Sequence, residues 1–371
     1  MNYNSTGYYN ISTPVAVIFT IYMSAATVVA IIGNAMALMV IYRQTSLHNT
    51  AGILMANLAV ADLLIAIFNM PATIISLATS QWPLSPITCQ MSGFMMTFAT
   101  GVSLFTLVVI SIDRCISIKK PLRYKQHFQF FQYVALLSLL WLYPTIMATI
   151  PLLGLQSISL GQYQYLDSKA YCWIAIDQHR PNLGYVSLVM LTMTAALIIF
   201  STCYVIIYRS AKKNYAQIVT LTYMRELNRQ KFKSNLKTAS TLSIIVGVFM
   251  FCWSPLVLLD IVSIIAQQPF FNVFSIAALR LALSNSAYNP IIYGIFNQSF
   301  RKGFKDIMTN FCQWVKTGNP NQVQQFYTDG RDVDYKSEIR RKTTVQYSIH
   351  MDIAGCNIIE QKKSKCVMAK T

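Results

Sequence analysis

Residues 14–42 read PVAVIFTIYMSAATVVAIIGNAMALMVIY and contain no charged side chain. A helix at the surface of a soluble protein shows a polar face every 3.6 residues, and this stretch has no such face. Crossing the hydrocarbon core of a bilayer takes about 20 consecutive apolar residues in a helix. The stretch therefore predicts a membrane-spanning helix and argues against a soluble helical bundle.

The composition of the whole chain agrees with a membrane protein. Of its 371 residues, 54% are hydrophobic and 12% are charged, and the mean hydropathy is +0.43. Soluble domains carry about 25% charged residues. The net charge of +17 raises nucleic acid as a partner, but the basic residues lie in short clusters between apolar runs, as they do in membrane proteins. We expect membrane lipids, and no nucleic acid, among the partners.

Seven runs of the chain are long and apolar enough to span a bilayer. The predicted fold class is an all-α membrane protein, a seven-transmembrane helix bundle. We expect an extracellular N-terminus over 1–13, a membrane domain over 14–305 and a polar cytoplasmic tail over 306–371, which lacks helical periodicity and reads as disordered. The runs cover residues 14–42, 51–78, 89–112, 129–154, 183–208, 238–260 and 271–296.

The charges of the connecting segments orient the bundle. Basic residues gather after the first, third and fifth runs and at the start of the tail, whereas the 155–183 loop balances its acids and bases. By the positive-inside rule the N-terminus lies outside and the tail in the cytoplasm, as in a multi-pass protein of the plasma membrane. Asn4 and Asn10 begin glycosylation sequons on the outer side. A bridge between Cys89 and Cys172 would persist in that oxidising environment.

Several short motifs follow one another along these runs. They are GNAMALMV at 33–40, NLAVADLL at 57–64, DRC at 113–115, Trp141, CWSP at 252–255, NPIIY at 289–293 and FNQSFRKGF at 296–304. Together they resemble the motifs of the rhodopsin-like (class A) G-protein-coupled receptors, over essentially residues 14–305. Cys89 matches the conserved loop cysteine of that family, and Cys115 replaces its usual Tyr. The resemblance implies a short amphipathic eighth helix over 296–304 and a receptor that performs no catalysis.

The resemblance assigns an activation switch to the inner half of the bundle. Asp113 would hold Arg114 in the inactive state, and on activation Arg114 would enter the pocket where the C-terminus of a heterotrimeric G protein docks. The alternative is that Arg114 only anchors a helix end by snorkelling. Asn235 stands where the sixth span often carries a Glu that locks this Arg, so we expect basal signalling. The full set expected for coupling and activation is Asp113, Arg114, Tyr204, Phe249, Trp253, Pro255, Asn289, Pro290 and Tyr293.

Asp62 is a lone carboxylate near the middle of the second run. An ionisable residue at that depth is costly and marks function by default. The resemblance makes it the floor of an allosteric sodium site whose further oxygen ligands are Ser103, Asn285, Ser286 and Asn289. The alternative is a protonated Asp62 in a polar cluster with Asn34 and Asn289.

The resemblance places a ligand pocket among the outer halves of spans three, five, six and seven, beneath the 155–183 loop. Amine receptors carry an Asp seven residues after the span-three cysteine, where this chain has Met96, and opsins carry a retinal-binding Lys where it has Leu283. We therefore expect an extracellular ligand that is lipid-like, a small neutral molecule or a peptide. The expected pocket residues are Met96, Thr97, Thr100, Thr192, Trp253, Val257, Asp260 and Leu283.

Two charged residues lie near this pocket. Asp260 follows Trp253 by nearly two helical turns and shares its face. Arg280 lies half a turn off the face of Asn289, so we expect it to point toward the first span or lipid. An ion pair between Asp260 and Arg280 is one alternative, and a headgroup location for both charges is another.

The tail carries candidate modification sites. Cys312 follows the amphipathic helix and is a palmitoylation candidate, with a free thiol as the alternative. Candidate sites for receptor kinases, and so for arrestin recruitment, are Thr317, Ser337, Thr343, Thr344 and Ser348.

Other classes of membrane protein make different predictions. A transporter or channel would use Asp62 as its ion site, but it would also show related repeats, and none is evident. A relative of the opsins that works without retinal would keep the fold and lack the Lys. A membrane enzyme would need paired titratable groups within the spans, and the four histidines all lie in loops or the tail. We expect no catalytic residue and no cofactor apart from the allosteric sodium ion.

Overall fold

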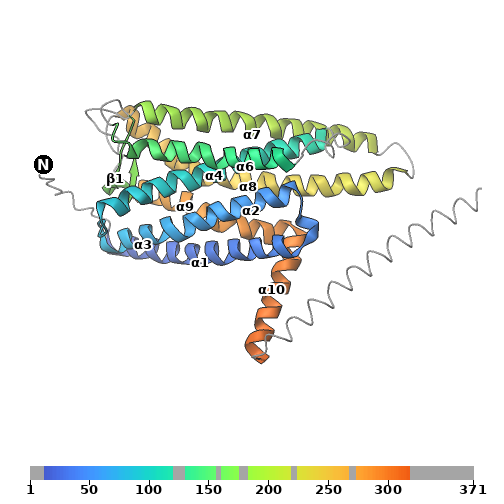
Figure 1. Cartoon of the computed structure of the whole chain (residues 1–371), viewed down its shortest axis with the longest axis horizontal. Coiled ribbons are helices and arrows are strands. Elements are labelled where there is room, and N and C mark those ends of the chain that lie inside the picture. The colour runs from blue at the N-terminus through green and yellow to red at the C-terminus, as the bar shows by residue number, and fades with distance from the viewer. Residues whose placement is uncertain are drawn as a thin grey trace, which may run out of the picture. The chain divides into compact units, whose positions relative to one another are not determined.

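A computed structural model describes residues 12–119, 130–155, 160–174, 183–218, 224–266 and 273–317. The chain divides after Phe304 into two units, and the first unit is a bundle of long helices that lie side by side (Figure 1). One span, Thr50–Thr79, is composite: α2 (Thr50–Leu64), the π turn η2 (Ile65–Asn69) and α3 (Met70–Thr79). The other long helices are α1 (Thr13–Arg43), α4 (Pro86–Lys119), α6 (Phe130–Thr149), α7 (Leu183–Ile218), α8 (Met224–Ala266) and α9 (Val273–Phe296).

Six helical segments in the described part of the chain are long and apolar enough to cross a membrane. The helix α9 does not reach that level of hydropathy because its 24 residues include Arg280, Asn285 and Asn289. All three side chains are buried, and 24 residues at about 1.5 Å each are long enough to span the hydrocarbon core. The helix α9 completes the bundle, and the predicted seven-helix class is confirmed.

The π turn in the second span has a local cause. Pro71 stands at the start of α3 and has no backbone N–H to continue the ladder of the preceding helix. The helix takes in one extra residue in a wider π turn over Ile65–Asn69 and then continues as an α-helix. Asn69, at the end of this turn, is fully buried.

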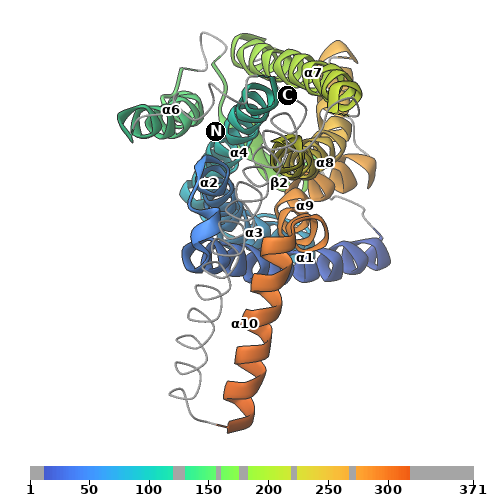
Figure 2. The same cartoon turned by 90° about the vertical axis from the view of Figure 1, so that its right-hand side faces the viewer.

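The helix α4 is the central element of the bundle. It packs against α2, α6, α7 and α8 and also contacts both strands described below, and Figure 2 shows it within the group that these helices form. The helix α9 closes the other side by packing against α1 and α8.

Motif residues explain several of these helix contacts. Gly33 on α1 lies against Pro290 on α9, since a Cβ at Gly33 would come within 2.5 Å of the Pro290 ring. Asn57 on α2 donates to Thr106 on α4 at 2.7 Å and accepts from the indole N–H of Trp141 on α6 at 2.8 Å. These residues hold three neighbouring helices in register.

A β-hairpin covers one end of the bundle, which we call the hairpin end. Strand β1 (Tyr163–Leu166) runs antiparallel to β2 (Tyr171–Ile174), with Tyr165 opposite Cys172. The short 3₁₀ turn η5 (Asp167–Lys169) joins the strands. Two further 3₁₀ turns follow long helices: η1 (Thr45–Leu47) after α1 and η3 (Ile150–Leu152) after α6.

The helix α10 (Gln298–Thr317) follows α9. Asn297 caps its N-terminus by accepting from the backbone N–H of Ser299 at 3.0 Å. Gly303 lies against Val40 of α1, because a Cβ there would meet that side chain at 2.6 Å. The helix continues to Thr317, so residues 306–317, which we assigned to the tail, are helical.

Candidate functional site

The hairpin is fixed to the bundle by one covalent bond and several polar contacts. A disulfide joins Cys172 of β2 to Cys89 at the start of α4, with the two Cα atoms 5.4 Å apart. Arg280 of α9 donates to the carbonyl of Lys169 and, at 3.2 Å, to that of Ala170. Ser76 of α3 also donates to the Ala170 carbonyl, at 2.9 Å. The turn of the hairpin is therefore held from below by buried donors on two helices.

Buried tyrosines fix the two strands. The Tyr171 hydroxyl donates to Asn69 at 2.5 Å and accepts from Ser92 at 2.7 Å. The Tyr163 hydroxyl donates to the carbonyl of Ala148 at 3.1 Å. Burial raises the pKa of both phenols above their usual range, so both remain neutral hydrogen-bond donors.

An ion pair links the hairpin to α8. The Lys169 ammonium lies 2.6 Å from Asp260 and 5.5 Å from the centre of the Trp173 ring. The Lys169 side chain is 7% exposed and that of Asp260 19%. This pairing corrects two expectations, since Asp260 is paired with a hairpin residue and Arg280 is fully buried with its guanidinium on the hairpin carbonyls.

A small cavity lies beneath the hairpin. Its volume is about 130 Å³, and its walls come from α4, α6, α7, α8 and β2. Trp173 and Ile174 of β2 are part of its lining. Six expected pocket residues line it: Thr97, Thr100, Thr192, Trp253, Val257 and Asp260.

Met96 and Leu283 do not line this cavity, contrary to our expectation. Both side chains are buried elsewhere in the bundle, and the Met96 sulfur accepts from Thr100 at 3.9 Å. The physical reason is the position of the cavity, which extends toward α6 and α7 and includes no residue of α9. Residue spacing along the chain predicted which face of each helix points inward. It did not predict that the cavity lies closer to α6 and α7 than to α9.

The residues that the sequence missed include every lining residue of α6, a helix from which none was expected. Tyr143 and Met147 line the cavity, and the Tyr143 hydroxyl lies 2.9 Å from that of Thr192 on α7. Pro144 lies against Gly101 of α4, where a Cβ would meet the ring at 2.8 Å. The pairing of a glycine in one span with a proline in another was the available clue to this close approach.

A cluster of buried polar residues lies deeper in the bundle, around Asp62. Asn289 of α9 donates to Asp62 at 2.7 Å, and Asn34 of α1 donates to the backbone carbonyl of Ser286 at 2.9 Å. Several buried oxygens of this cluster have no hydrogen-bond partner within the described part of the chain. They are Oδ1 of Asn34, Asp62, Asn285 and Asn289 and Oγ of Ser103 and Ser286.

Unpaired buried oxygens around one carboxylate suit a particular kind of ion. Carboxylate, amide and hydroxyl oxygens are hard ligands that bind hard cations. Asp62 is the one member of this set that belongs to the residue types which usually bind zinc or copper, and within the described ranges no cluster of three or more His, Cys, Asp or Glu residues suited to a metal ion is present. The donors around Asp62 fit a monovalent hard cation such as sodium.

The opposite end of the bundle holds the Asp113–Arg114 pair, and we call it the Arg114 end. The guanidinium donates to the neighbouring carboxylate, from Nε at 2.8 Å. Arg114 is 8% exposed and Asp113 is 4% exposed, so a buried charge pair ends the apolar part of α4. Ser111 lies about one helical turn before Arg114 on α4, and its hydroxyl is 3.5 Å from that of Tyr204 on α7.

The other expected switch residues lie on α8 and α9. The Phe249 ring stacks on that of Trp253, with centroids 5.9 Å apart. Pro255 and Pro290 stand inside their helices, where each removes one backbone hydrogen bond. Tyr293 is buried and stacks on Phe300 of α10 at 4.9 Å.

Several predicted sites lie outside the described residues. These are the sequons at Asn4 and Asn10, the side chains of Asn235 and Thr317, and Ser337, Thr343, Thr344 and Ser348. Cys312 lies on α10 and is a free, exposed cysteine.

Seven long helices, a disulfide-linked hairpin over an interior cavity and a buried Asp–Arg pair at the opposite end define a membrane receptor fold. The comparisons with known proteins agree. Residues 33–293 match the family model described as "7 transmembrane receptor (rhodopsin family)", and the chain belongs to that family. It is a multi-pass membrane receptor of the kind that signals through G proteins.

Relatives within the family are moderately similar. The chain is 28% identical to melatonin receptor type 1A of Ovis aries over 293 residues, which cover 77% of this chain and 75% of that receptor. It is 27% identical to dopamine receptor 1 of Drosophila melanogaster over 346 residues, covering 84% and 67%. The crystal structure of squid rhodopsin matches the fold with a TM-score of 0.69 at 19% identity, covering 77% of this chain and 80% of that one.

Proposed function

We propose that this receptor binds a small neutral, largely apolar ligand in the cavity beneath the hairpin and activates a heterotrimeric G protein through Arg114. One observation carries the ligand class. Among the described residues that line the cavity, Asp260 alone is acidic, and Lys169 of the hairpin already pairs with it at 2.6 Å. A basic ligand would have to displace a buried internal ion pair, whereas a neutral ligand leaves it intact.

The size of the cavity refines this proposal. Ligand pockets usually have volumes of about 300–1,000 Å³, and this cavity measures about 130 Å³. Ligand binding therefore requires movement of the hairpin or of the α6, α7 and α8 walls. The names of the relatives supply two probes: melatonin, an amide without a basic amine, and dopamine, a primary amine. Our proposal favours the first kind of molecule.

The direction of signalling follows from the charges of the loops. We propose that the hairpin end faces the outside and that the Arg114 end faces the cytoplasm, because the basic clusters lie on the Arg114 side. A ligand under the hairpin would press on Trp253 and Val257 of α8. Movement of α8 would then change the surroundings of Arg114 and expose a docking site for the G protein, with receptor kinases and arrestin acting later at the tail.

A panel of G-protein dissociation sensors tests this function. We expect a basal signal in at least one sensor, and its loss in Arg114→Ala at equal surface expression. Val257→Trp fills the cavity and should lower the response to a neutral ligand by about tenfold or more. Phe251→Trp is the matched control, because Phe251 lies on the same helix, is 68% exposed and is not part of the lining. Equal responses in the two Trp variants would contradict the proposed pocket.

Sodium binding at Asp62 is a separate part of the proposal. Asp62 would supply the charge, and Ser103, Asn285, Ser286 and Asn289 would supply neutral oxygens. Sodium bound there would stabilise the packing of α2, α4 and α9 around the polar cluster. We expect sodium chloride to raise the melting temperature of the purified receptor above that in potassium chloride, and Asp62→Asn to abolish the difference. A difference that survives in Asp62→Asn would place the ion elsewhere.

A further inference from the structure

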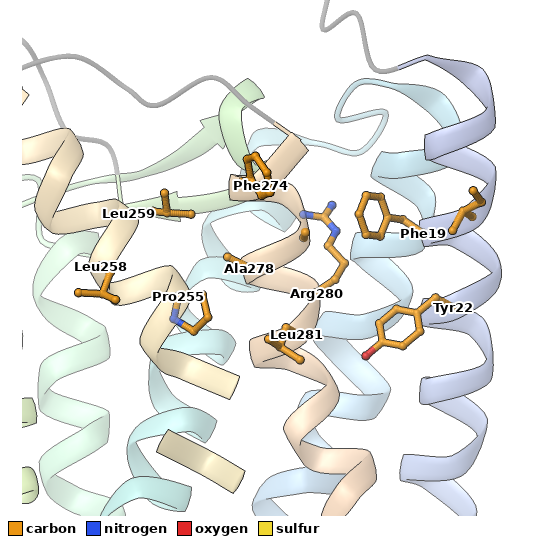
Figure 3. Close-up of a pocket in the computed structure, with 11 residues that line it drawn as sticks. Phe19, Tyr22, Pro255, Leu258, Leu259, Phe274, Ala278, Arg280 and Leu281 are labelled. Atoms are coloured by element: carbon orange, nitrogen blue, oxygen red, sulfur yellow. The ribbon is translucent and has the colours of Figure 1, made fainter. Parts of the chain in front are cut away.

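A second cavity lies on the outer surface of the bundle near the hairpin end. It is a groove of about 700 Å³, several times the volume of the cavity beneath the hairpin. The helix α9 forms its floor, and α1 and α8 form its walls (Figure 3). These helices are apolar enough to span a membrane or belong to the bundle that does, so the groove opens into the hydrocarbon of the bilayer.

The lining of the groove is almost entirely apolar. Phe19 of α1 and Phe274 of α9 border it in Figure 3, and Leu258 of α8 is also part of the lining. Leu258 and Phe274 are 60% and 68% exposed, which means that lipid or a bound molecule covers them. The small side chains Ala277 and Ala278 form part of the floor and give the groove its depth.

The arginine in the lining does not make the groove an anion site. Arg280 is fully buried, and its guanidinium donates to the carbonyls of Lys169 and Ala170 in the hairpin. Its side chain is part of the lining, and a long basic side chain commonly covers apolar surface with its aliphatic stem. A lipid with a charged headgroup therefore gains no ion pair here, and a neutral occupant fits the site better.

The proportions of the groove favour a broad occupant. Its floor runs from Phe274 to Leu281, a rise of about 10 Å along a helix. The volume divided by that length leaves a mean cross-section of about 70 Å². A single hydrocarbon chain, whose carbons touch their neighbours at about 4 Å, fills only about 20 Å². A fused-ring lipid is wide and short enough to fill the groove.

We propose that this groove is a binding site for a sterol-class lipid taken from the surrounding bilayer. The site has a clear route to the signalling core. Pro255, Leu258 and Leu259 of α8 line the groove, while Leu256, Val257 and Asp260 of the same segment line the interior cavity. A bound sterol braces the outer face of α8, and so limits the movement that a ligand on the inner face must produce.

Photo-crosslinking of the full-length purified receptor in phosphatidylcholine nanodiscs tests this proposal. The probe is a cholesterol analogue with a diazirine on its ring system. We expect labelled residues on α1 around Phe19 and on α9 between Phe274 and Leu281, and we expect excess unlabelled cholesterol to remove the label. This binding does not depend on the ligand or on coupling, so it can succeed or fail independently of the proposed function.

Variants and a second probe separate a built site from general lipid contact. Ala277→Trp fills the groove and should lower the labelling by about tenfold, which corresponds to about 1.4 kcal/mol. Ile198→Trp on α7 is the control, because Ile198 is 62% exposed and lies outside the groove. A phosphatidylcholine with a diazirine in its acyl chain should label the outer faces of all spans without saturation.

Three results would overturn the proposal. The first is sterol labelling spread evenly over the outer faces of the helices. The second is labelling that excess cholesterol does not reduce, which can be read on the wild-type receptor even if Ala277→Trp fails to fold. The third is equal, saturable labelling of the groove by the acyl-chain probe, which would show that the groove holds ordinary phospholipid chains.

Discussion

The interior cavity and the membrane groove lie on opposite faces of the same stretch of α8, residues 253–264. The interior cavity holds about 130 Å³ under a roof that is fixed by a disulfide, buried hydrogen bonds and an ion pair. The groove holds about 700 Å³ between α1, α8 and α9, and no hairpin residue is part of its lining within the described ranges. The difference shows where binding needs a conformational change: the interior site must open, whereas the groove is already formed.

The disulfide should contribute most to the closed interior cavity. Cys89 and Cys172 are 83 residues apart in sequence, and bridges over long loops typically stabilise a folded protein by about 2–4 kcal/mol. We expect Cys89→Ala to lower the melting temperature more than any other change proposed here. It should also speed amide exchange of Tyr171 and Ile174 in β2.

Cys312→Ala is the control for this prediction, because Cys312 is a free, exposed cysteine on α10. It should leave both the melting temperature and hairpin exchange unchanged. If Cys89→Ala left amide exchange in β2 at the wild-type rate, the polar contacts alone would hold the hairpin over the cavity. The disulfide would then not explain why the interior cavity is closed and the groove is open.

Arg280 should have the next largest effect. In Arg280→Ala the carbonyls of Lys169 and Ala170 lose their buried donors, and an unsatisfied buried group costs about 1–3 kcal/mol. Ser76 still donates to Ala170, so the cost should fall at the lower end of that range. We expect faster amide exchange in the η5 turn, while the strands keep their protection through the disulfide.

Arg301→Ala serves as the comparison, since Arg301 is exposed on α10 and its side chain makes a long hydrogen bond of 3.4 Å to the carbonyl of Ile295. Exchange in η5 should not respond to it. If Arg280→Ala changed sterol labelling of the groove but not exchange in the hairpin, the main role of Arg280 would be to shape the groove floor rather than to hold the roof.

The Lys169–Asp260 pair should show a smaller effect, which a double-mutant cycle can isolate. Lys169→Met and Asp260→Asn each leave one largely buried charged group without its ionic partner. The double variant removes both charges, so its loss of stability should be less than the sum of the two single losses. We expect a coupling energy of about 1 kcal/mol. Additive melting-temperature changes would show that the pair does not help to close the cavity.

The sequence was sufficient to predict the seven helices, because apolar runs that long have few other structural explanations. Motif residues such as Gly33 and Trp141 were assigned to the correct spans, although their contacts are with residues distant in sequence, Pro290 and Asn57. The hairpin was not predicted: β1 and β2 are only four residues each, and their stability comes from Cys89, Arg280 and Ser76, which are distant in sequence. The pairing of Asp260 with Lys169 depends on that hairpin, so it was missed as well.

The groove could not be predicted for a different reason. Helical periodicity tells which residues of α8 share a face, and it correctly placed Asp260 on the face of Trp253. It does not tell how far α1 and α8 stand apart over α9, because that spacing depends on small side chains such as Ala277 and Ala278 packing in three dimensions. An apolar stretch of sequence therefore does not distinguish a helix face that only contacts lipid from one that lines a groove.

Two adjacent residues of α8 provide the finest test of the comparison. Val257 lines the interior cavity and Leu258 lines the groove. Val257→Ala removes packed atoms next to the cavity and should cost about 1 kcal/mol of stability. Leu258→Ala removes a larger side chain, yet it should change the stability hardly at all, because lipid chains replace its contacts and are as apolar as leucine.

The two variants should separate again in binding. Leu258→Ala should weaken saturable sterol labelling by a few-fold, about 1 kcal/mol or less, while the response to a neutral ligand stays near the wild-type level. Val257→Ala should do the reverse and leave sterol labelling unchanged. If both variants altered both readouts equally, α8 would transmit any local change across its width, and the two cavities would have to be treated as one coupled site.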